Sequence, residues 1–416
     1  MTTTTSTPES IGTFHAFRNA NFRTYFVGQL ISISGTWMQN LAQGYLVFQL
    51  TRSEAWLGIV ACAAGLPIVL MSPLTGVLVE RFPRRQLLYF TQVCQMVFAL
   101  LLAYLTASEQ VQVWHIVTLA LLLGATNAID VPARWTIVSE LVSKEDLRSG
   151  IALNSMLNSG ARVLGPVVAG LVLVRFGPAL CFLLNALSYL AAMTSLTLIR
   201  IPYELPPTRG TDPMAQLRAG FTFVRQDAVV RVLLLLAVIG GVFVIPLLQL
   251  MPAFADVVLN SPEEGYAALS AAQGAGSVAA GAAVGLLAAR WGFQRIIPTA
   301  TLLAGAFMVL LAAQQTVITA GLVSLLVGFF MILQFIAINT TLQLIVPSDY
   351  RGRVMALYTL SFTGIAPFGA LMLGFIANAV GTPAALALYG TLSAVVGMWL
   401  WQRAHISELV RVRLAA

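Results

Sequence analysis

The chain has 416 residues, of which 58% are hydrophobic and 9% are charged. About a quarter of the residues in soluble proteins are charged, so this composition excludes an ordinary soluble protein and predicts a polytopic membrane protein. The formal net charge of +7 is spread over the turns between apolar segments, without the basic stripe of a nucleic-acid-binding protein, so we expect no nucleic-acid partner.

Twelve apolar segments predict an all-α membrane protein with twelve transmembrane helices in two six-helix bundles. Their bounds are 23–50, 55–79, 87–107, 113–139, 150–174, 178–199, 230–252, 265–289, 296–313, 318–345, 354–379 and 383–402. The expected parts are a cytoplasmic N-terminal segment at 1–22, an N-terminal bundle at 23–199, a cytoplasmic linker with an amphipathic helix at 200–229, a C-terminal bundle at 230–402 and a cytoplasmic tail at 403–416.

The orientation follows from the basic residues. Most Lys and Arg residues fall in turns on the side of both termini, and the positive-inside rule places that side in the cytoplasm. The polar N-terminus shows no cleavable leader pattern, so we expect the first helix to be retained. We therefore expect a multi-pass protein of a bacterial-type cytoplasmic (inner) membrane, with both termini in the cytoplasm.

The first helix carries a polar and aromatic cluster about midway along its length, formed by Trp37, Gln39, Asn40, Gln43 and Tyr45. Gln39 and Gln43 are one turn apart and share a face. One interpretation is that these amides bond only to neighbouring helices. The other is that they line a cavity for a large amphipathic solute. Candidate partners in the second half are Gln249, Gln273, Gln334, Asn339 and Tyr358.

The turn after the second helix is basic and carries Gly76, Glu80, Arg81, Arg84 and Arg85. By charge alone, this turn is explained as a cytoplasmic loop that obeys the orientation rule. The segment GVLVERFPRRQLL from Gly76 matches GLLAARWGFQRII in the second half, and glycines further along match in the same way. The two halves therefore read as repeats, which is typical of transporters built from duplicated bundles.

Residues 127–166 hold charged side chains deep in the membrane. Asp130 and Arg162 lie at equal sequence distances from Asp146, in the turn between two apolar helices, which predicts similar depths. Arg134 is one turn from Asp130, so the simplest role of these two is a static ion pair that lowers the cost of burial. The alternative is a central site in which one acid faces two bases, binds a polar or anionic solute and carries the coupling proton on Asp130.

Small residues recur in the fifth and eighth helices. They are Gly160, Gly165, Pro166 and Gly170 in the fifth helix, and Gly281 and Gly285 in the eighth. Close helix packing is the simplest explanation of the glycines. Pro166 is expected to bend its helix because it lacks a backbone donor.

The basic turn resembles the loop signature of the major facilitator superfamily, G-x-x-x-D-R-x-G-R-R, with Glu80 for Asp and Pro83 for Gly. The segments DVPARWTIVSEL, from Asp130, and RGRVMALY, from Arg351, are similar to the exporter branch that includes enterobactin exporters and macrolide efflux proteins. The resemblance implies that the fifth and eighth helices rock against each other and that the basic turn latches the cytoplasmic side closed. The implied latch partners are Glu140, Glu145 and Asp146.

Together with the resemblance, these features predict a secondary active transporter that exports a medium-sized organic solute, a siderophore or an amphiphilic drug, in exchange for protons. The alternatives are a non-transporting receptor of the same fold and a membrane-embedded enzyme. His15, His115 and His405 are far apart in sequence and no nucleophile or metal motif is present, so we predict no enzyme, metal or cofactor. We expect a monomer in the lipid bilayer, with the solute and protons as partners.

Overall fold

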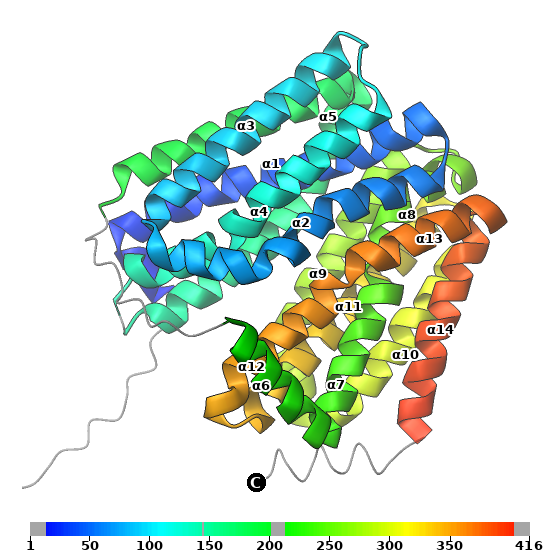
Figure 1. The fold of residues 1–416 in the computed structure, drawn as a ribbon. Coiled ribbons are helices and arrows are strands. Elements are labelled where there is room, and N and C mark those ends of the chain that lie inside the picture. Colours follow the sequence, from blue (N-terminus) through cyan, green and yellow to red (C-terminus); the bar gives the residue numbers. More distant parts are fainter. Residues whose placement is uncertain (1–13, 144, 201–212, 403–416) are drawn as a thin grey trace, which may run out of the picture.

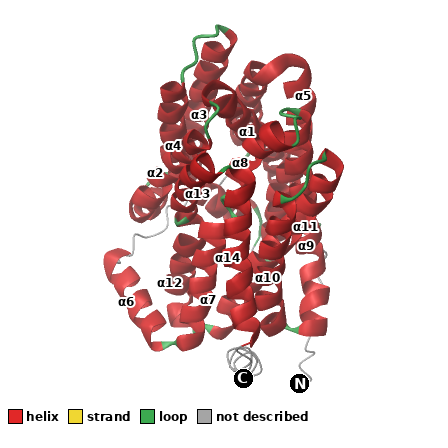
Figure 2. Ribbon diagram, turned by 90° about the vertical axis from the view of Figure 1, so that its right-hand side faces the viewer, coloured by secondary structure: helices red, strands yellow, loops and turns green. Residues whose placement is uncertain are grey.

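The computed structural model describes residues 14–143, 145–200 and 213–402, which form helices joined by short turns (Figure 1). These residues include no strand (Figure 2), so the all-α prediction is confirmed for this part of the chain. The predicted cytoplasmic tail at 403–416 lies outside the described residues, as do 1–13, Lys144 and residues 201–212 of the predicted linker.

The first half of the chain begins with a short 3-10 helix, η1 (His15–Arg18), followed by a capped helix start. The Asn19 Oδ1 atom accepts hydrogen bonds from the backbone amides of Asn21 (2.9 Å) and Phe22 (3.4 Å). These bonds satisfy donors that the first turn of a helix leaves open. The helices of this half are α1 (Ala20–Thr51), α2 (Glu54–Arg81), α3 (Arg84–Ala107), α4 (Val113–Leu141) and α5 (Leu147–Leu198).

Helix α5 consists of two parts. Its 52 residues would extend over about 78 Å as one straight helix, whereas the hydrocarbon core of a bilayer is about 30 Å thick. Gly177 interrupts the helix with φ 77° and ψ 179°, a conformation that favours glycine, and Pro178 follows it. The parts are therefore 147–176 and 178–198, and the break lies where the sequence predicts the turn between the fifth and sixth spans.

The second half begins with α6 (Pro213–Gln226), which lies beside α12 (Ser348–Thr359). The rings of Phe223 and Tyr350 stack with centroids 4.7 Å apart and join the two helices. The other helices are α7 (Ala228–Ile239), α8 (Leu247–Ala253), α9 (Glu264–Trp291), α10 (Phe293–Ala312), α11 (Val317–Ile345), α13 (Ala366–Val380) and α14 (Thr382–Gln402). The π-helical turns η2 (Gly240–Val244), η3 (Phe254–Val258) and η4 (Leu360–Gly364) extend or connect these helices.

Ten helical segments of the described residues are long and apolar enough to cross a membrane. Helix α5 is counted once although it breaks at Gly177, and α1 is not among the ten. The sequence of α1 holds polar side chains such as Gln29, Gln39 and Asn40, which lower its hydropathy. Large apolar side chains on the outer faces, such as Leu286 and Ile318, are exposed, as expected for a surface solvated by lipid.

The helices form two groups, α1 to α5 and α6 to α14 (Figure 1). The groups converge near α8 and α13 and diverge toward α6 and α12. Between the groups, α2 lies beside α13, and α5 lies beside α9. We call the end with η1, α6 and the α2–α3 turn the linker end, and the end with the α1–α2 turn and Gly177 the far end.

The two groups share a hydrophobic core at the far end. One cluster of buried side chains joins Phe182 of the first half to Tyr389 of the second. Toward the linker end each half has a cluster of its own, one around Ile137 and the other around Ile338. Burial of apolar surface therefore holds the halves together at the far end and leaves them separate at the linker end.

Candidate solute cavity

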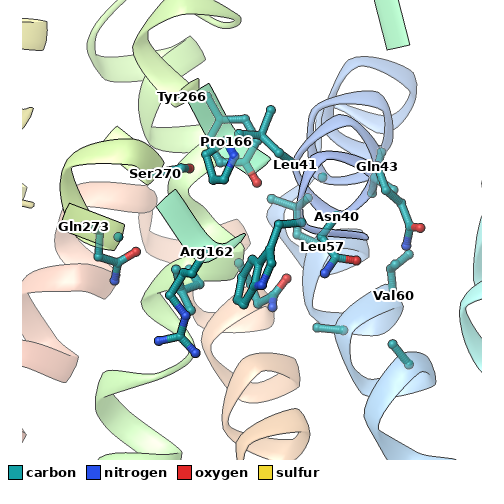
Figure 3. A pocket seen from close by; sticks show the side chains of 18 of the residues that line it. Asn40, Leu41, Gln43, Leu57, Val60, Arg162, Pro166, Tyr266, Ser270 and Gln273 are labelled. Atoms are coloured by element: carbon teal, nitrogen blue, oxygen red, sulfur yellow. The ribbon is translucent and has the colours of Figure 1, made fainter. Parts of the chain in front are cut away.

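A cavity of about 290 Å³ lies between the two halves (Figure 3). Helices α1, α2 and α5 line it from the first half, and α8, α9 and α11 line it from the second. Its walls combine apolar side chains with a small set of polar or aromatic ones, as is typical of a small-molecule site. The latter are Trp37, Asn40, Gln43, Arg162, Gln249, Tyr266, Ser270, Gln273 and Ser277.

Three residues of the predicted α1 cluster, Trp37, Asn40 and Gln43, line the cavity from consecutive turns of one helix face. The other two lie elsewhere. Gln39 is buried inside the first half, where its Oε1 atom accepts a hydrogen bond from Asn185 Nδ2 (2.6 Å). Tyr45 is nearer the far end, and its hydroxyl donates to Glu263 (2.5 Å). Gln39 and Gln43 are one turn apart on the same side of α1. That side contacts both the cavity and the rest of the first half, so only Gln43 lines the cavity.

In the second half, Gln249 and Gln273 line the cavity as predicted partners. Gln334, Asn339 and Tyr358 are not among its lining residues. Gln334 is buried, Asn339 accepts a hydrogen bond from Gln343 (2.6 Å), and the Tyr358 hydroxyl donates to the carbonyl of Phe335 (2.9 Å). Tyr266, Ser270 and Ser277 of α9 also line the cavity and were not predicted from the sequence. Their spacing with Gln273 follows one helical face, which is the signal that identifies them.

Arg162 carries the only charged side chain among the described residues that line the cavity. Its guanidinium carbon lies 5.0 Å from the centroid of the Trp37 ring, a cation–π contact. No carboxylate in the described part of the chain lies within ion-pair distance of this guanidinium. Pro166, one turn further along α5, also lines the cavity.

Asp130 and Arg134 form an ion pair inside the first half, with 2.6 Å between Oδ2 and Nε. Asp130 is 1% exposed, and its Oδ1 atom accepts hydrogen bonds from Thr91 (2.8 Å) and Gln92 (3.1 Å) of α3. Neither member of the pair lines the cavity. The structure therefore does not bring Arg162 into one site with this pair. Equal sequence distances from a turn fix the depth of two residues in a membrane, but not the helix face on which each lies.

Polar contacts also join the two halves at the far end, beyond the cavity. They are hydrogen bonds from Tyr45 to Glu263 (2.5 Å), Gln49 to Asp256 (2.9 Å), Ser53 to Asn378 (2.7 Å) and Thr382 to Glu54 (2.8 Å), and an ion pair between Arg52 and Asp256 (2.5 Å). Together with the shared core, these contacts close the cavity toward the far end.

The profile of the transmembrane secretion effector family matches residues 11–412 of the chain. The chain belongs to this family. Its members are transporters of the major facilitator superfamily, so the predicted superfamily is confirmed and the membrane-embedded enzyme is excluded.

The proteins to which this chain is similar include two exporters. The chain is 27% identical to the enterobactin exporter of Shigella flexneri, over 88% of this chain and 87% of that protein. It is 21% identical to macrolide efflux protein A of Streptococcus pyogenes, over 89% of this chain and 93% of that protein. Its fold matches the crystal structure of a D-xylose–proton symporter with a TM-score of 0.73, at 14% identity, over 92% of this chain and 97% of that one.

In this chain, the arginines of the basic turn contact other elements of the first half. Arg84 Nη1 lies 2.6 Å from Glu140 Oε1, which joins the start of α3 to the end of α4. Arg85 Nη2 donates to the carbonyl of Thr197 (3.2 Å) at the end of α5. These contacts fix the turn against its own half at the linker end.

The other predicted latch residues lie around the same turn. Asp146 accepts a hydrogen bond from His15, and this bond holds the pKa of the Asp146 carboxyl below its ordinary value. Arg81 and Glu145 are exposed. Gly76 and Glu80 lie in the last turns of α2, and their surroundings lie outside the described part of the structure.

We expect Arg84→Ala to lower transport about ten-fold while the affinity for the solute stays within a few-fold. A hydrogen bond between charged groups contributes about 1.5–3 kcal/mol, and its loss would free the turn that, in the predicted latch, contacts the other half. The measurement is solute flux together with equilibrium binding. Arg175→Ala, at an exposed arginine outside the turn, is the matched control. Wild-type flux in Arg84→Ala at normal expression would show that the pair has no part in the cycle.

The predicted packing glycines divide into two sets. A Cβ atom on Gly165 would lie 2.4 Å from Trp37 Cβ, and one on Gly170 would lie 2.5 Å from Ala267 Cβ, so both positions require close approach. No atom lies within 4 Å of a Cβ on Gly160, Gly281 or Gly285. These three lie toward the linker end, where the halves diverge, so their faces are unpacked in this conformation.

Proposed function

We propose that the chain is an alternating-access exporter that moves a medium-sized organic solute, a siderophore or an amphiphilic drug, out of the cytoplasm in exchange for protons. The observation that carries this proposal is the cavity between the halves, which both halves line and which the far-end contacts close on one side. The names of the enterobactin exporter and the macrolide efflux protein support export and this solute class.

The orientation belongs to the same proposal. We count α1 and each part of α5 as separate crossings, which together with the other long apolar segments gives the twelve crossings of this proposal. The described chain begins with η1 and ends with the last turn of α14, and both lie at the linker end. The bias of basic residues toward that end supports a cytoplasmic location for it in the inner membrane. The conformation described here is then inward-facing, closed to the outside by the far-end contacts. We propose that the protein works as a monomer.

Proton coupling is assigned to Asp130 in this proposal. Asp130 is a deeply buried carboxyl that forms an ion pair with the neighbouring Arg134. Separation of the two side chains during rocking would leave a buried charge without its partner, which favours binding of a proton in place of the lost ion pair. Binding a proton on the outside and releasing it inside would drive export.

The test of function is solute flux in proteoliposomes with an imposed pH gradient. Gradient-driven accumulation of an enterobactin-type siderophore or a macrolide is the expected result. A non-transporting receptor would bind one of these solutes without moving it. Flux that does not respond to the pH gradient would support export of the solute but contradict exchange for protons.

We expect Gln43→Ala to change which solutes are exported. Its amide lines the cavity. Removing this amide would leave the hydrogen-bonding groups of a bound solute desolvated and without a partner. A change in relative export of about ten-fold between solutes corresponds to one such interaction. Gln343→Ala is the matched control because this amide is exposed on α11. Identical export profiles for wild type and Gln43→Ala across a broad solute panel would assign Gln43 to helix packing.

A further inference from the structure

The charge of the cavity is unbalanced. Arg162 places a guanidinium in it, and the described residues supply no carboxylate partner. Asp130 is the acid at similar predicted depth. It pairs with Arg134 and accepts hydrogen bonds from Thr91 and Gln92. A cation held away from bulk water without a counter-ion is costly, so a ligand that supplies the missing negative charge would be favoured.

A second unpaired donor lies on the opposite half. The side chain of Gln273 is 2% exposed and lines the cavity, and its Nε2 atom has no hydrogen-bond partner. Helices α5 and α9 are close at this point, because a Cβ on Gly274 would lie 2.9 Å from the carbonyl oxygen of Arg162. Figure 3 shows Arg162 and Gln273 on the same side of the cavity, across from Gln43.

The remaining walls define the rest of a ligand. The Trp37 ring lies beside the guanidinium, and Leu57, Val60 and Met331 add apolar surface. These side chains offer the contacts that a flat aromatic or apolar body would need. The guanidinium and the amide present N–H donors at one end, an arrangement that suits the two oxygens of a carboxylate.

We propose that the transported solute is an organic anion, whose carboxylate or equivalent acidic group binds between Arg162 and Gln273 while its apolar body packs on Trp37. The inference rests on the proposed transport function and specifies its substrate class. Because one donor comes from each half, the anion bridges α5 and α9 and links solute binding to the movement of the halves.

The test compares matched probes on the full-length protein in lipid nanodiscs. The probes are aromatic carboxylates and their uncharged amides, among them 2-naphthoate with 2-naphthamide and indole-3-acetate with indole-3-acetamide. We expect the wild type to bind at least one carboxylate about ten-fold more tightly than its amide, because hydrogen bonds to charged groups are the stronger ones. Arg162→Gln should remove this preference by weakening carboxylate binding more than amide binding, and Arg162→Lys should keep part of it.

Two further variants keep the test decisive. Gln273→Glu places a carboxylate near Arg162 and should abolish the preference with the arginine still present, even if Arg162→Gln does not fold. Arg175→Gln removes an exposed arginine outside the cavity and should change nothing. The proposal is overturned if no carboxylate binds more tightly than its amide, or if the preference survives both Arg162→Gln and Gln273→Glu.

The outcomes also separate this inference from the transport function. Flux of the neutral amides without any preference for carboxylates would leave an exporter with a different substrate class. Selective carboxylate binding without flux would leave an anion site in a protein that does not transport.

Discussion

Replacing Gly281 or Gly285 by leucine should arrest the transport cycle in the conformation described here. Helices α5 and α9 already touch closer to the far end, where a Cβ on Gly170 would lie 2.5 Å from Ala267 Cβ. At Gly281 and Gly285 no atom lies within 4 Å of a Cβ, so leucine is accommodated now. Closure of the linker end would press these positions against α5. Overpacking a close contact costs about 1–3 kcal/mol per site, which lowers the closed population by about five-fold to 150-fold.

The measurement is flux in proteoliposomes together with solute binding. We expect flux to fall by at least about five-fold in each variant and further in the double variant, while binding to the open conformation is retained. Gly321→Leu is the matched control, because Gly321 also has open space around its Cβ position but lies on α11. Wild-type flux in the double variant would show that the linker-end part of α9 does not close against α5.

Asp130→Asn should abolish export driven by a pH gradient while solute counterflow continues. An amide cannot exchange the proton that the carboxyl carries in the proposed cycle, whereas exchange of solute for solute needs no net proton movement. Asp130 is 1% exposed and accepts from Thr91 and Gln92 besides its pair with Arg134, so the substitution keeps polar partners for the new side chain. The measurement compares gradient-driven accumulation with counterflow in the same vesicles.

The competing role for Asp130 is a static ion pair. Removing one member of a buried pair is destabilising by about 3–5 kcal/mol, because the other charge is left uncompensated. A static role therefore predicts that Asp130→Asn is not recovered folded, and that adding Arg134→Gln restores expression together with gradient-driven export. Intact accumulation in folded Asp130→Asn would rule out Asp130 as the proton carrier. A folded double variant that shows counterflow only would support the carrier role.

The sequence predicted most of the elements, because hydropathy reports directly which segments can be solvated by lipid. The turn near Gly177 was found in this way, although the helix there is continuous except for one residue. Individual side chains were harder to place. Trp37, Asn40 and Gln43 share the cavity-facing side of α1, whereas Gln39 bonds to Asn185 in another helix, and only the packing of α1 against α5 decides this.

Contacts between distant segments could not be predicted. Asp256 and Glu263 hold the far end through partners more than two hundred residues earlier, and nothing in the local pattern of either segment signals the other. Arg162 was predicted to lie deep in the membrane, but the sequence cannot say whether its partner is a carboxylate or the Trp37 ring. Pairing of this kind is set by how helices are rotated about their axes, which many tertiary contacts determine together.

The apolar core that the two halves share at the far end gives the conformational exchange a calorimetric signature. Opening the far end would bring side chains such as Phe254 and Tyr389 into contact with water, and hydration of apolar surface raises the heat capacity. Unless closure of the linker end buries an equal apolar area, the inward-to-outward equilibrium has a curved dependence on temperature. Turnover should then give a bent Arrhenius plot even in a bilayer that has no phase transition, and cooling should favour whichever conformation exposes more apolar surface.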